Sequence, residues 1–286
     1  MSKIRIIAIV FCTIGIIVAG FMILKTASDY RRAENEYADL TQYVKATDGT
    51  SDTPSESSTL PGGGMSAALN EAENSDIVES EEVELKRNYN RSDFPEIEVD
   101  FASLSAINAG VVAWLYAPGA QINYPVVQTT DNEFYLHHTF EMKKNSSGCV
   151  FMDWEVDPNL TSWNTFFYGH NMKNGTMFGH LKNYINNKNV YDKDPYFYVF
   201  RPDGIYRYEI FSYYLDTVDS KMYYTCDNFR EYRAYLREAT AKSVRECTAK
   251  ATPDLNIATL VTCSGSGANK QRFFVHGVFK DRYLYE

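Results

Sequence analysis

The sequence predicts a mainly β domain, an eight-stranded closed or nearly closed barrel with peripheral helices, preceded by an N-terminal transmembrane helix and a linker. Three observations support this prediction. Short apolar runs rich in β-branched and aromatic residues recur through residues 91–286, separated by turn residues. Few stretches there have helical periodicity. A closed barrel is favoured because it leaves no strand edge exposed.

The N-terminal segment predicts a membrane span. Residues 6–24 hold no charged side chain, and Lys3 and Arg5 precede them. As a helix, this segment would rise roughly 28 Å, close to the thickness of a bilayer's hydrocarbon core. A cleaved signal peptide is the alternative, but no convincing small-residue cleavage site follows Leu24. We therefore expect an uncleaved signal anchor in residues 1–28. The positive-inside rule barely orients it, since basic residues stand on both sides.

Residues 29–90 predict a charged stalk followed by an acidic linker. Tyr30, Ala33, Tyr37 and Leu40 have helical spacing, and we expect a solvated helix leaving the membrane. Residues 47–85 contain ten acidic side chains and no Lys or Arg, in a background of Ser, Thr, Gly and Pro. The whole formal net charge of −9 can be assigned to this stretch, which predicts a disordered tether. An acidic patch that binds a partner is the alternative.

The elements of the domain at 91–286 follow from apolar patterning. Strands are expected at residues 111–116, 122–128, 149–152, 163–168, 196–201, 205–216, 256–262 and 272–279. Helices are expected at residues 100–108, 177–186 and 228–247. The basic residues form no stripe with interleaved aromatics, so the sequence does not favour nucleic-acid binding.

Three residues near strand ends are candidates for chemistry. Cys263 ends a buried strand and is followed by a flexible Ser-Gly-Ser-Gly loop. Arg272 opens the next strand, so a hairpin would bring the guanidinium to the end of the sheet that carries the sulfur. His170 follows the apolar run at 163–168. A buried, inert cysteine is the alternative, but two strand ends could present the Cys, the His and the Arg together, which favours a reactive site.

The other cysteines and histidines indicate no metal site and no disulfide framework. Cys226 and Cys247 flank the helix expected at 228–247, which would hold them roughly 30 Å apart. A break in that helix would allow them to pair. Cys149 is expected in the core. No Cys or His spacing is typical of a zinc site, and we expect no cofactor.

The strand end at residues 259–263, Thr-Leu-Val-Thr-Cys, with a His upstream and an Arg downstream, resembles the signature of the sortases. These are cysteine transpeptidases of Gram-positive cell surfaces. Four further blocks, which begin at Val112, Asn123, Asp131 and Gly148, resemble class B sortases in particular. The likeness covers roughly residues 97–282. It implies a sortase-type barrel and a catalytic domain outside the cell, held by a single span of the cell membrane.

The resemblance also implies a site and a reaction. Cys263 would be the nucleophile, His170 the proton carrier and Arg272 the charge that stabilises the oxyanion. The substrate would be a surface protein with a C-terminal sorting pentapeptide, cut after its Thr through a Cys263 thioester. The acceptor would be an amine of a peptidoglycan precursor. The residues expected to contact the substrate are Asn132, Leu136, Tyr168 and, on weaker grounds, Thr262.

Two departures from the class B pattern leave the sorting signal open. Val261 stands where class B members often have Ser, and Gly265 stands where an acidic residue would assist the His. Other classes of function also stay open. A hydrolytic cysteine protease would use the same Cys and His, but with an Asn or Asp that orients the His rather than an Arg beside the Cys. A sortase that polymerises pilins would use a pilin amine as acceptor, and a non-catalytic adhesin would leave all three residues incidental.

Overall fold

The computed structural model of the chain describes residues 3–46, 90–263 and 271–285. The barrel strands are β3 (Val111–Ala117), β4 (Ile122–Val127), β5 (Val150–Met152), β6 (Asn164–His170), β7 (Tyr196–Arg201), β8 (Gly204–Thr217), β9 (Ile257–Cys263) and β10 (Gln271–Leu284). Within the described ranges these eight strands close in the order β10-β8-β7-β3-β4-β5-β6-β9. The predicted eight-stranded barrel is confirmed.

The strands form where apolar residues bury on both faces. The barrel is filled by fully buried aromatic side chains such as Trp114, Phe167 and Phe200, as the apolar runs predicted. β10 is longer than expected and continues to Leu284 across two register shifts. β5 pairs in parallel with β4, and β9 pairs in parallel with β6, so the barrel is a mixed sheet.

The helices are α3 (Phe101–Ile107), α4 (Asn183–Asn186), α5 (Lys188–Lys193) and α6 (Phe229–Lys242), with 3-10 turns η1 (Thr41–Tyr43), η2 (Arg91–Asp93), η3 (Pro118–Ala120), η4 (Phe134–Leu136) and η5 (Lys221–Tyr223). The helix expected at 177–186 is wrong in its first part, because Met177 has a positive φ of 53° and pairs with Asn171 in an isolated β-bridge. The helix expected at 228–247 ends early, at Lys242, because Ser243 leaves helical geometry.

The early end of α6 changes the argument about the cysteines. The separation of roughly 30 Å assumed a continuous helix between Cys226 and Cys247, and that assumption is wrong. In the part of the chain that the structure describes, Cys12, Cys149, Cys226 and Cys247 are free thiols. Cys149 is buried, as expected.

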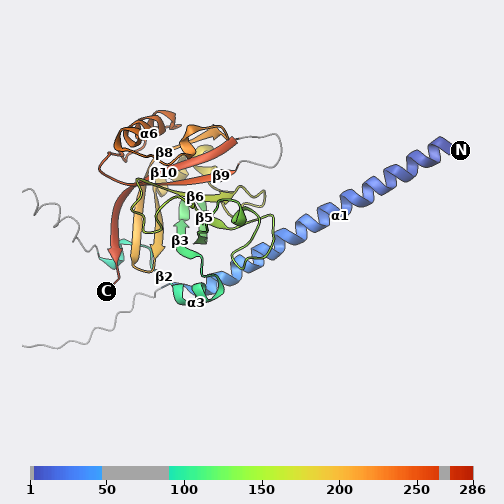
Figure 1. Cartoon of the computed structure of the whole chain (residues 1–286), viewed down its shortest axis with the longest axis horizontal. Helices are drawn as coiled ribbons and strands as arrows, with labels where there is room; N and C mark the ends of the chain where they lie inside the picture. Colours follow the sequence, from blue (N-terminus) through green and yellow to red (C-terminus); the bar gives the residue numbers. More distant parts are fainter. Residues whose placement is uncertain (1–2, 47–89, 264–270, 286) are drawn as a thin grey trace, which may run out of the picture.

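A single long helix, α1 (Lys3–Leu40), extends away from the barrel (Figure 1). Large apolar side chains along its outer part are uncovered, among them Phe11, at 72% exposure, and Ile17, at 69%. The helix is long and apolar enough to cross a membrane. This agrees with the predicted N-terminal span.

The expectation of a solvated stalk is wrong for the last turns of α1. The helical prediction holds, but Ala33, Tyr37 and Leu40 are buried against the barrel domain at 3%, 7% and 2% exposure. The helical spacing of these residues is therefore a packing stripe. The predicted division at residue 90, which assigned 29–46 to a stalk, separates segments that pack together.

A two-stranded ribbon follows the docked helix. β1 (Val44–Ala46) pairs with β2 (Ile97–Val99), and Ala46 lies opposite Ile97. The acidic linker predicted at 47–85 lies outside the described residues. The chain on either side of it is held together by this ribbon.

Candidate active site

Three adjacent strands bring the candidate residues into one row. β9 lies between β6 and β10, pairing in parallel with β6 and antiparallel with β10. In this register, Cys263 is the backbone partner of His170 on one side and of Arg272 on the other. The hairpin predicted from the sequence is confirmed. The parallel pairing with β6 adds His170 to the same end of the sheet, although it precedes Cys263 by more than ninety residues in the sequence.

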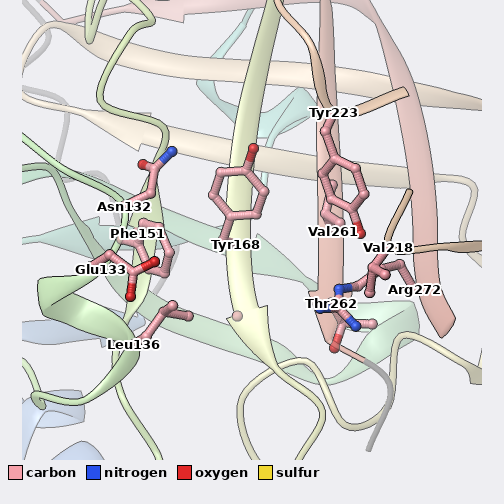
Figure 2. A pocket seen from close by; sticks show the side chains of 11 residues that line it. Asn132, Glu133, Leu136, Phe151, Tyr168, Val218, Tyr223, Val261, Thr262 and Arg272 are labelled. Atoms are coloured by element: carbon pink, nitrogen blue, oxygen red, sulfur yellow. The ribbon is translucent and has the colours of Figure 1, made fainter. Parts of the chain in front are cut away.

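A cavity of about 270 Å³ opens beside this row (Figure 2). Its walls come from η4 and the loop before it, from β5, β6, β9 and β10, and from η5 and the loop between β8 and η5. They comprise Asn132, Glu133, Leu136, Phe151, Tyr168, Gly169, Val218, Tyr223, Val261, Thr262 and Arg272. All four residues expected to contact a substrate, Asn132, Leu136, Tyr168 and Thr262, therefore line one cavity together with Arg272.

The His170 ring is held by a backbone carbonyl. Nε2 of His170 lies 2.8 Å from the carbonyl oxygen of Leu136. Because a carbonyl only accepts hydrogen bonds, Nε2 donates and Nδ1 is left to exchange a proton. Burial lowers the pKa of His170 below 6.5, and the charges of His137 and Arg272 act in the same direction, while the Leu136 carbonyl opposes them. The ring is therefore mainly neutral at pH 7.

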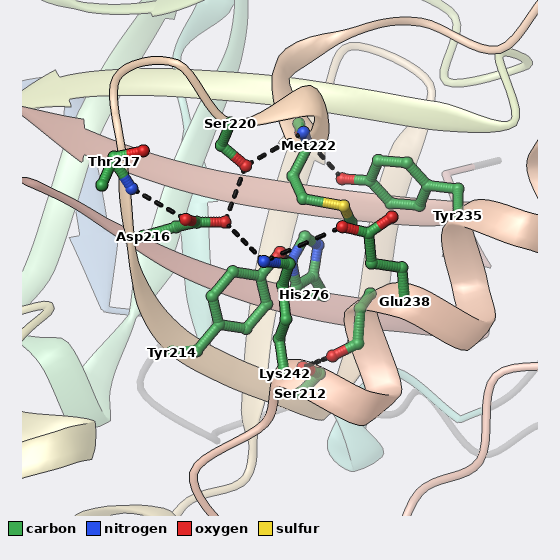
Figure 3. A network of polar contacts seen from close by, with 11 residues as sticks. Ser212, Tyr214, Asp216, Thr217, Ser220, Met222, Tyr235, Glu238, Lys242 and His276 are labelled. Atoms are coloured by element: carbon green, nitrogen blue, oxygen red, sulfur yellow. Dashed lines mark hydrogen bonds and ion pairs between the residues drawn. The ribbon is translucent and has the colours of Figure 1, made fainter.

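The Arg272 guanidinium lines the cavity, and among the described residues it has no ion-pair partner. It donates from Nη1 to the carbonyl of Gln271 at 3.0 Å, and no carboxylate among the described residues forms an ion pair with it. Its backbone partner on β8 is Asp216, which is bound elsewhere (Figure 3). The Asp216 carboxylate meets Nζ of Lys242 at 3.1 Å and accepts from Oγ of Ser220 at 2.7 Å. A positive charge thus remains available where the cavity meets the row.

A buried carboxylate that the sequence reasoning missed joins two of the cavity residues. Asp153 is 5% exposed, and its Oδ2 accepts from Nδ2 of Asn132 at 3.0 Å and from the hydroxyl of Tyr168 at 2.9 Å. Burial and the Asp153 charge raise the pKa of Tyr168, so its hydroxyl stays a donor. Asp153 ends the block that begins at Gly148. The only feature of the sequence that could have pointed to Asp153 as a site residue was its position directly after the strand β5.

Two of the other histidines have structural surroundings of their own. His138 stacks on Phe134 with ring centroids 4.0 Å apart. His276 is fully buried, with Nδ1 at 2.9 Å from Oγ1 of Thr259 and Nε2 at 2.9 Å from the hydroxyl of Tyr214. No group of three or more His, Cys, Asp or Glu side chains within the described ranges is arranged to hold a metal ion.

The row combines three residue types that acyl transfer requires. A cysteine supplies a nucleophile, a neutral histidine moves protons, and an arginine stabilises negative charge on a carbonyl oxygen. A neighbouring cavity lined by both apolar and hydrogen-bonding groups is suited to an extended peptide. This combination indicates cleavage or transfer of a peptide bond.

Comparison with known proteins agrees with this chemistry. Residues 115–280 match the Sortase domain family. Sortase B of Listeria monocytogenes is 34% identical over 178 residues, which cover 59% of this chain and 68% of that protein. The X-ray structure of Clostridium perfringens sortase B matches with a TM-score of 0.59 and 33% identity, covering 64% of this chain and 100% of that one. A Staphylococcus aureus sortase B–substrate complex matches with a TM-score of 0.59 and 31% identity, covering 63% and 84% of the two chains. The chain therefore belongs to the sortase family of cysteine transpeptidases, and its relatives are sortases B.

Proposed function

We propose that this sortase is anchored in the cell membrane, cleaves a C-terminal sorting signal of surface proteins after its Thr, and transfers the protein to a cell-wall amine. The observation that carries the proposal is the strand register that makes Cys263 the backbone partner of both His170 and Arg272. Residues that are direct partners on neighbouring strands project from the same face of a sheet. The register therefore supports a nucleophile, a proton carrier and a cation in neighbouring positions at one end of the barrel.

The two half-reactions follow from these roles. The thiol of Cys263 gives its proton to Nδ1 of His170, and the sulfur bonds to the carbonyl carbon of the Thr. His170 then returns this proton to the nitrogen of the scissile amide as that bond breaks, which leaves a thioester and a free amine. The incoming amine attacks the thioester, loses a proton to His170 and forms a new amide. The Cys263 sulfur leaves as the thiolate and takes the proton back.

Arg272 stabilises both tetrahedral intermediates. Each places a negative charge on the former carbonyl oxygen, and Arg272 brings a permanent positive charge to the cavity wall. The charge needs no reorganisation because no carboxylate among the described residues competes for it.

The cavity beside the row binds the sorting signal. Leu136 and Val261 offer apolar walls, whereas Asn132 and Tyr168 offer polar groups held by Asp153. Asp153 is buried and accepts hydrogen bonds from Asn132, Tyr168 and the backbone N–H of Glu155, so it acts through the first two side chains and fixes their orientation. Val261 makes this part of the wall apolar and so contributes to the choice of sorting signal that the cavity binds.

The apolar part of α1 anchors the enzyme. Its uncovered apolar side chains suit a bilayer, and a catalytic domain outside the cell is required for a reaction with wall amines. In this arrangement the barrel domain lies close to the external surface of the cell membrane, because α1 docks on the barrel within a few turns of its apolar stretch.

The test is capture of the thioester. The full chain in detergent is incubated with sorting peptides of the Asn-Pro-x-Thr and Leu-Pro-x-Thr-Gly types, and its intact mass is measured. We expect an acyl adduct in the wild type and none in Cys263→Ala, and we expect added hydroxylamine to release the peptide as its hydroxamate. An adduct that persists in Cys263→Ala removes Cys263 from the mechanism.

The same experiment separates transfer from hydrolysis. A sortase gives mainly the amine product when the amine is supplied, whereas a cysteine protease gives the free acid regardless of the amine. Replacing hydroxylamine with a peptidoglycan-type oligopeptide amine or with a lysine-bearing pilin peptide then distinguishes wall anchoring from pilus polymerisation.

A further inference from the structure

The last turns of α1 are hydrogen-bonded to the loop that ends at Gly148, next to the His170 ring. The carbonyl of Asp29 accepts from Nδ2 of Asn145 at 2.8 Å, and the Glu36 carboxylate accepts from the backbone N–H of Glu141 at 2.9 Å. The hydroxyl of Tyr37 donates to the carbonyl of Gly148 at 2.6 Å. All three bonds from the helix reach residues 141–148.

Gly148 lies directly against His170. It has a φ of +58°, and a Cβ added there would lie 3.0 Å from Cδ2 of His170 and 2.6 Å from the carbonyl oxygen of Tyr135. The next residue, Cys149, donates its N–H to the same Tyr135 carbonyl at 2.9 Å. Leu136, which follows Tyr135, provides the carbonyl that binds Nε2 of His170. One bond from Tyr37 therefore ends at the backbone that packs on the ring.

A second set of contacts connects Tyr37 to the other side of His170. The Tyr37 ring meets the Tyr124 ring edge to face, with centroids 5.4 Å apart. The Tyr124 hydroxyl accepts from the N–H of Met177 at 3.0 Å. Met177 lies in the turn that folds back on the strand end, where Phe178 donates its N–H to the carbonyl of His170 at 2.9 Å.

We propose that Tyr37 is a positioning residue for His170, so that the docked end of the anchor helix sets the orientation and tautomer of the imidazole. Tyr37 is 7% exposed and makes both connections from one side chain. Loss of its hydroxyl leaves the Gly148 carbonyl without its donor from α1 and frees the backbone that packs on the His170 ring. The inference rests on the proposed role of His170 in proton transfer.

The experiment compares Tyr37→Phe with a matched control, Tyr30→Phe, in the full chain in detergent. Tyr30 lies on the same helix and packs against the core, but the bonds from α1 to residues 141–148 come from Asp29, Glu36 and Tyr37. Tyr37→Phe removes the bond to Gly148 and keeps the ring contact with Tyr124. We expect kcat for peptide transfer to fall roughly two- to tenfold in Tyr37→Phe with KM unchanged. This is the factor by which one ordinary hydrogen bond favours the correctly oriented His170 ring over other orientations. Tyr30→Phe should match the wild type.

A second readout does not depend on activity. In chain labelled with ¹⁵N-histidine, long-range proton–nitrogen spectra report the tautomer of each ring, and His170→Gln assigns the signal of His170. We expect a loss of the Nε2–H tautomer of His170 in Tyr37→Phe and none in Tyr30→Phe. An unchanged tautomer together with an unchanged kcat in a folded Tyr37→Phe chain overturns the inference. A wild type that transfers no peptide, but whose His170 tautomer responds to Tyr37→Phe, overturns the proposed function and leaves the positioning role of Tyr37 in place.

Discussion

Gly148→Ala tests whether the loop beside His170 tolerates any displacement. The new Cβ would lie 2.6 Å from the Tyr135 carbonyl oxygen and 3.0 Å from both the Leu136 carbonyl oxygen and Cδ2 of His170. Two of these neighbours are backbone atoms, so the strain is not relieved by a rotamer change. The left-handed conformation at φ +58° costs about 1–2 kcal/mol for a residue with a Cβ, and the overlap adds about 1–3 kcal/mol. The sum of about 2–5 kcal/mol is a large share of a typical stability of about 5–15 kcal/mol.

The same strain displaces the catalytic geometry. Relief requires the carbonyl of Leu136 to move away from Gly148, and this carbonyl binds Nε2 of His170. A misplacement of about 1 Å lowers turnover by up to about 10²-fold. We therefore expect Gly148→Ala to lose both stability, measured by urea denaturation with tryptophan fluorescence, and kcat for peptide transfer, measured well below its melting temperature.

Gly204→Ala is the matched control. A Cβ at Gly204 would lie 2.3 Å from the Tyr283 carbonyl oxygen, so it also meets backbone, but at the opposite end of β10 from Arg272. We expect this variant to lose stability and keep its kcat per folded molecule. A Gly148→Ala enzyme whose kcat stays within twofold of that of Gly204→Ala would refute the reasoning.

Three further predictions concern the charge, the core and the linker. Arg272→Ala should lower kcat about 10²–10³-fold with a small change in KM. Arg272→Lys should recover only part of the lost kcat, because the planar guanidinium is gone. Near-normal turnover in a folded Arg272→Ala chain would leave only the Cys–His pair that a protease shares. Burial lowers the pKa of His276 to about 3, so as the pH falls from 6.5 to 5 the unfolded chain takes up a proton that the folded chain refuses. Stability should therefore fall with falling pH, with a slope that rises toward a limit of about 1.4 kcal/mol per pH unit. His276→Gln should lack this part of the slope in denaturation curves, and equal slopes would contradict the assignment. Replacing residues 50–86 with a short Gly/Ser loop should leave melting temperature and peptide transfer unchanged. The pairing of Ala46 with Ile97 already brings the two ends of this segment close together, so a short loop can join them. A large loss of either property would show that the segment has a structural role.

The sequence determined the features that depend on local patterns. The apolar runs located the eight barrel strands because side-chain alternation and β-branched composition act over a few residues. The apolar stretch at 6–24 located the outer part of α1 for the same reason. Cys263 and Arg272 were placed together correctly because only a short loop separates their strands, and antiparallel pairing is the expected result. His170 was connected to them through the resemblance to the sortases, not through its own spacing.

Only the tertiary structure decided the contacts between distant segments. A stripe at helical spacing on residues 30–40 looks the same whether it faces solvent or a barrel, so the docking of Tyr37 and Leu40 was invisible in the sequence. Asp153 acquired its role because β5 and β6 carry it to Tyr168, and the Leu136 carbonyl reached His170 through a loop whose path no periodicity encodes. The helix expected from Met177 failed because tertiary contacts hold that residue at positive φ against its local preference. Side-chain patterns record which face of an element is apolar, whereas the partner of that face is settled by packing of the whole chain.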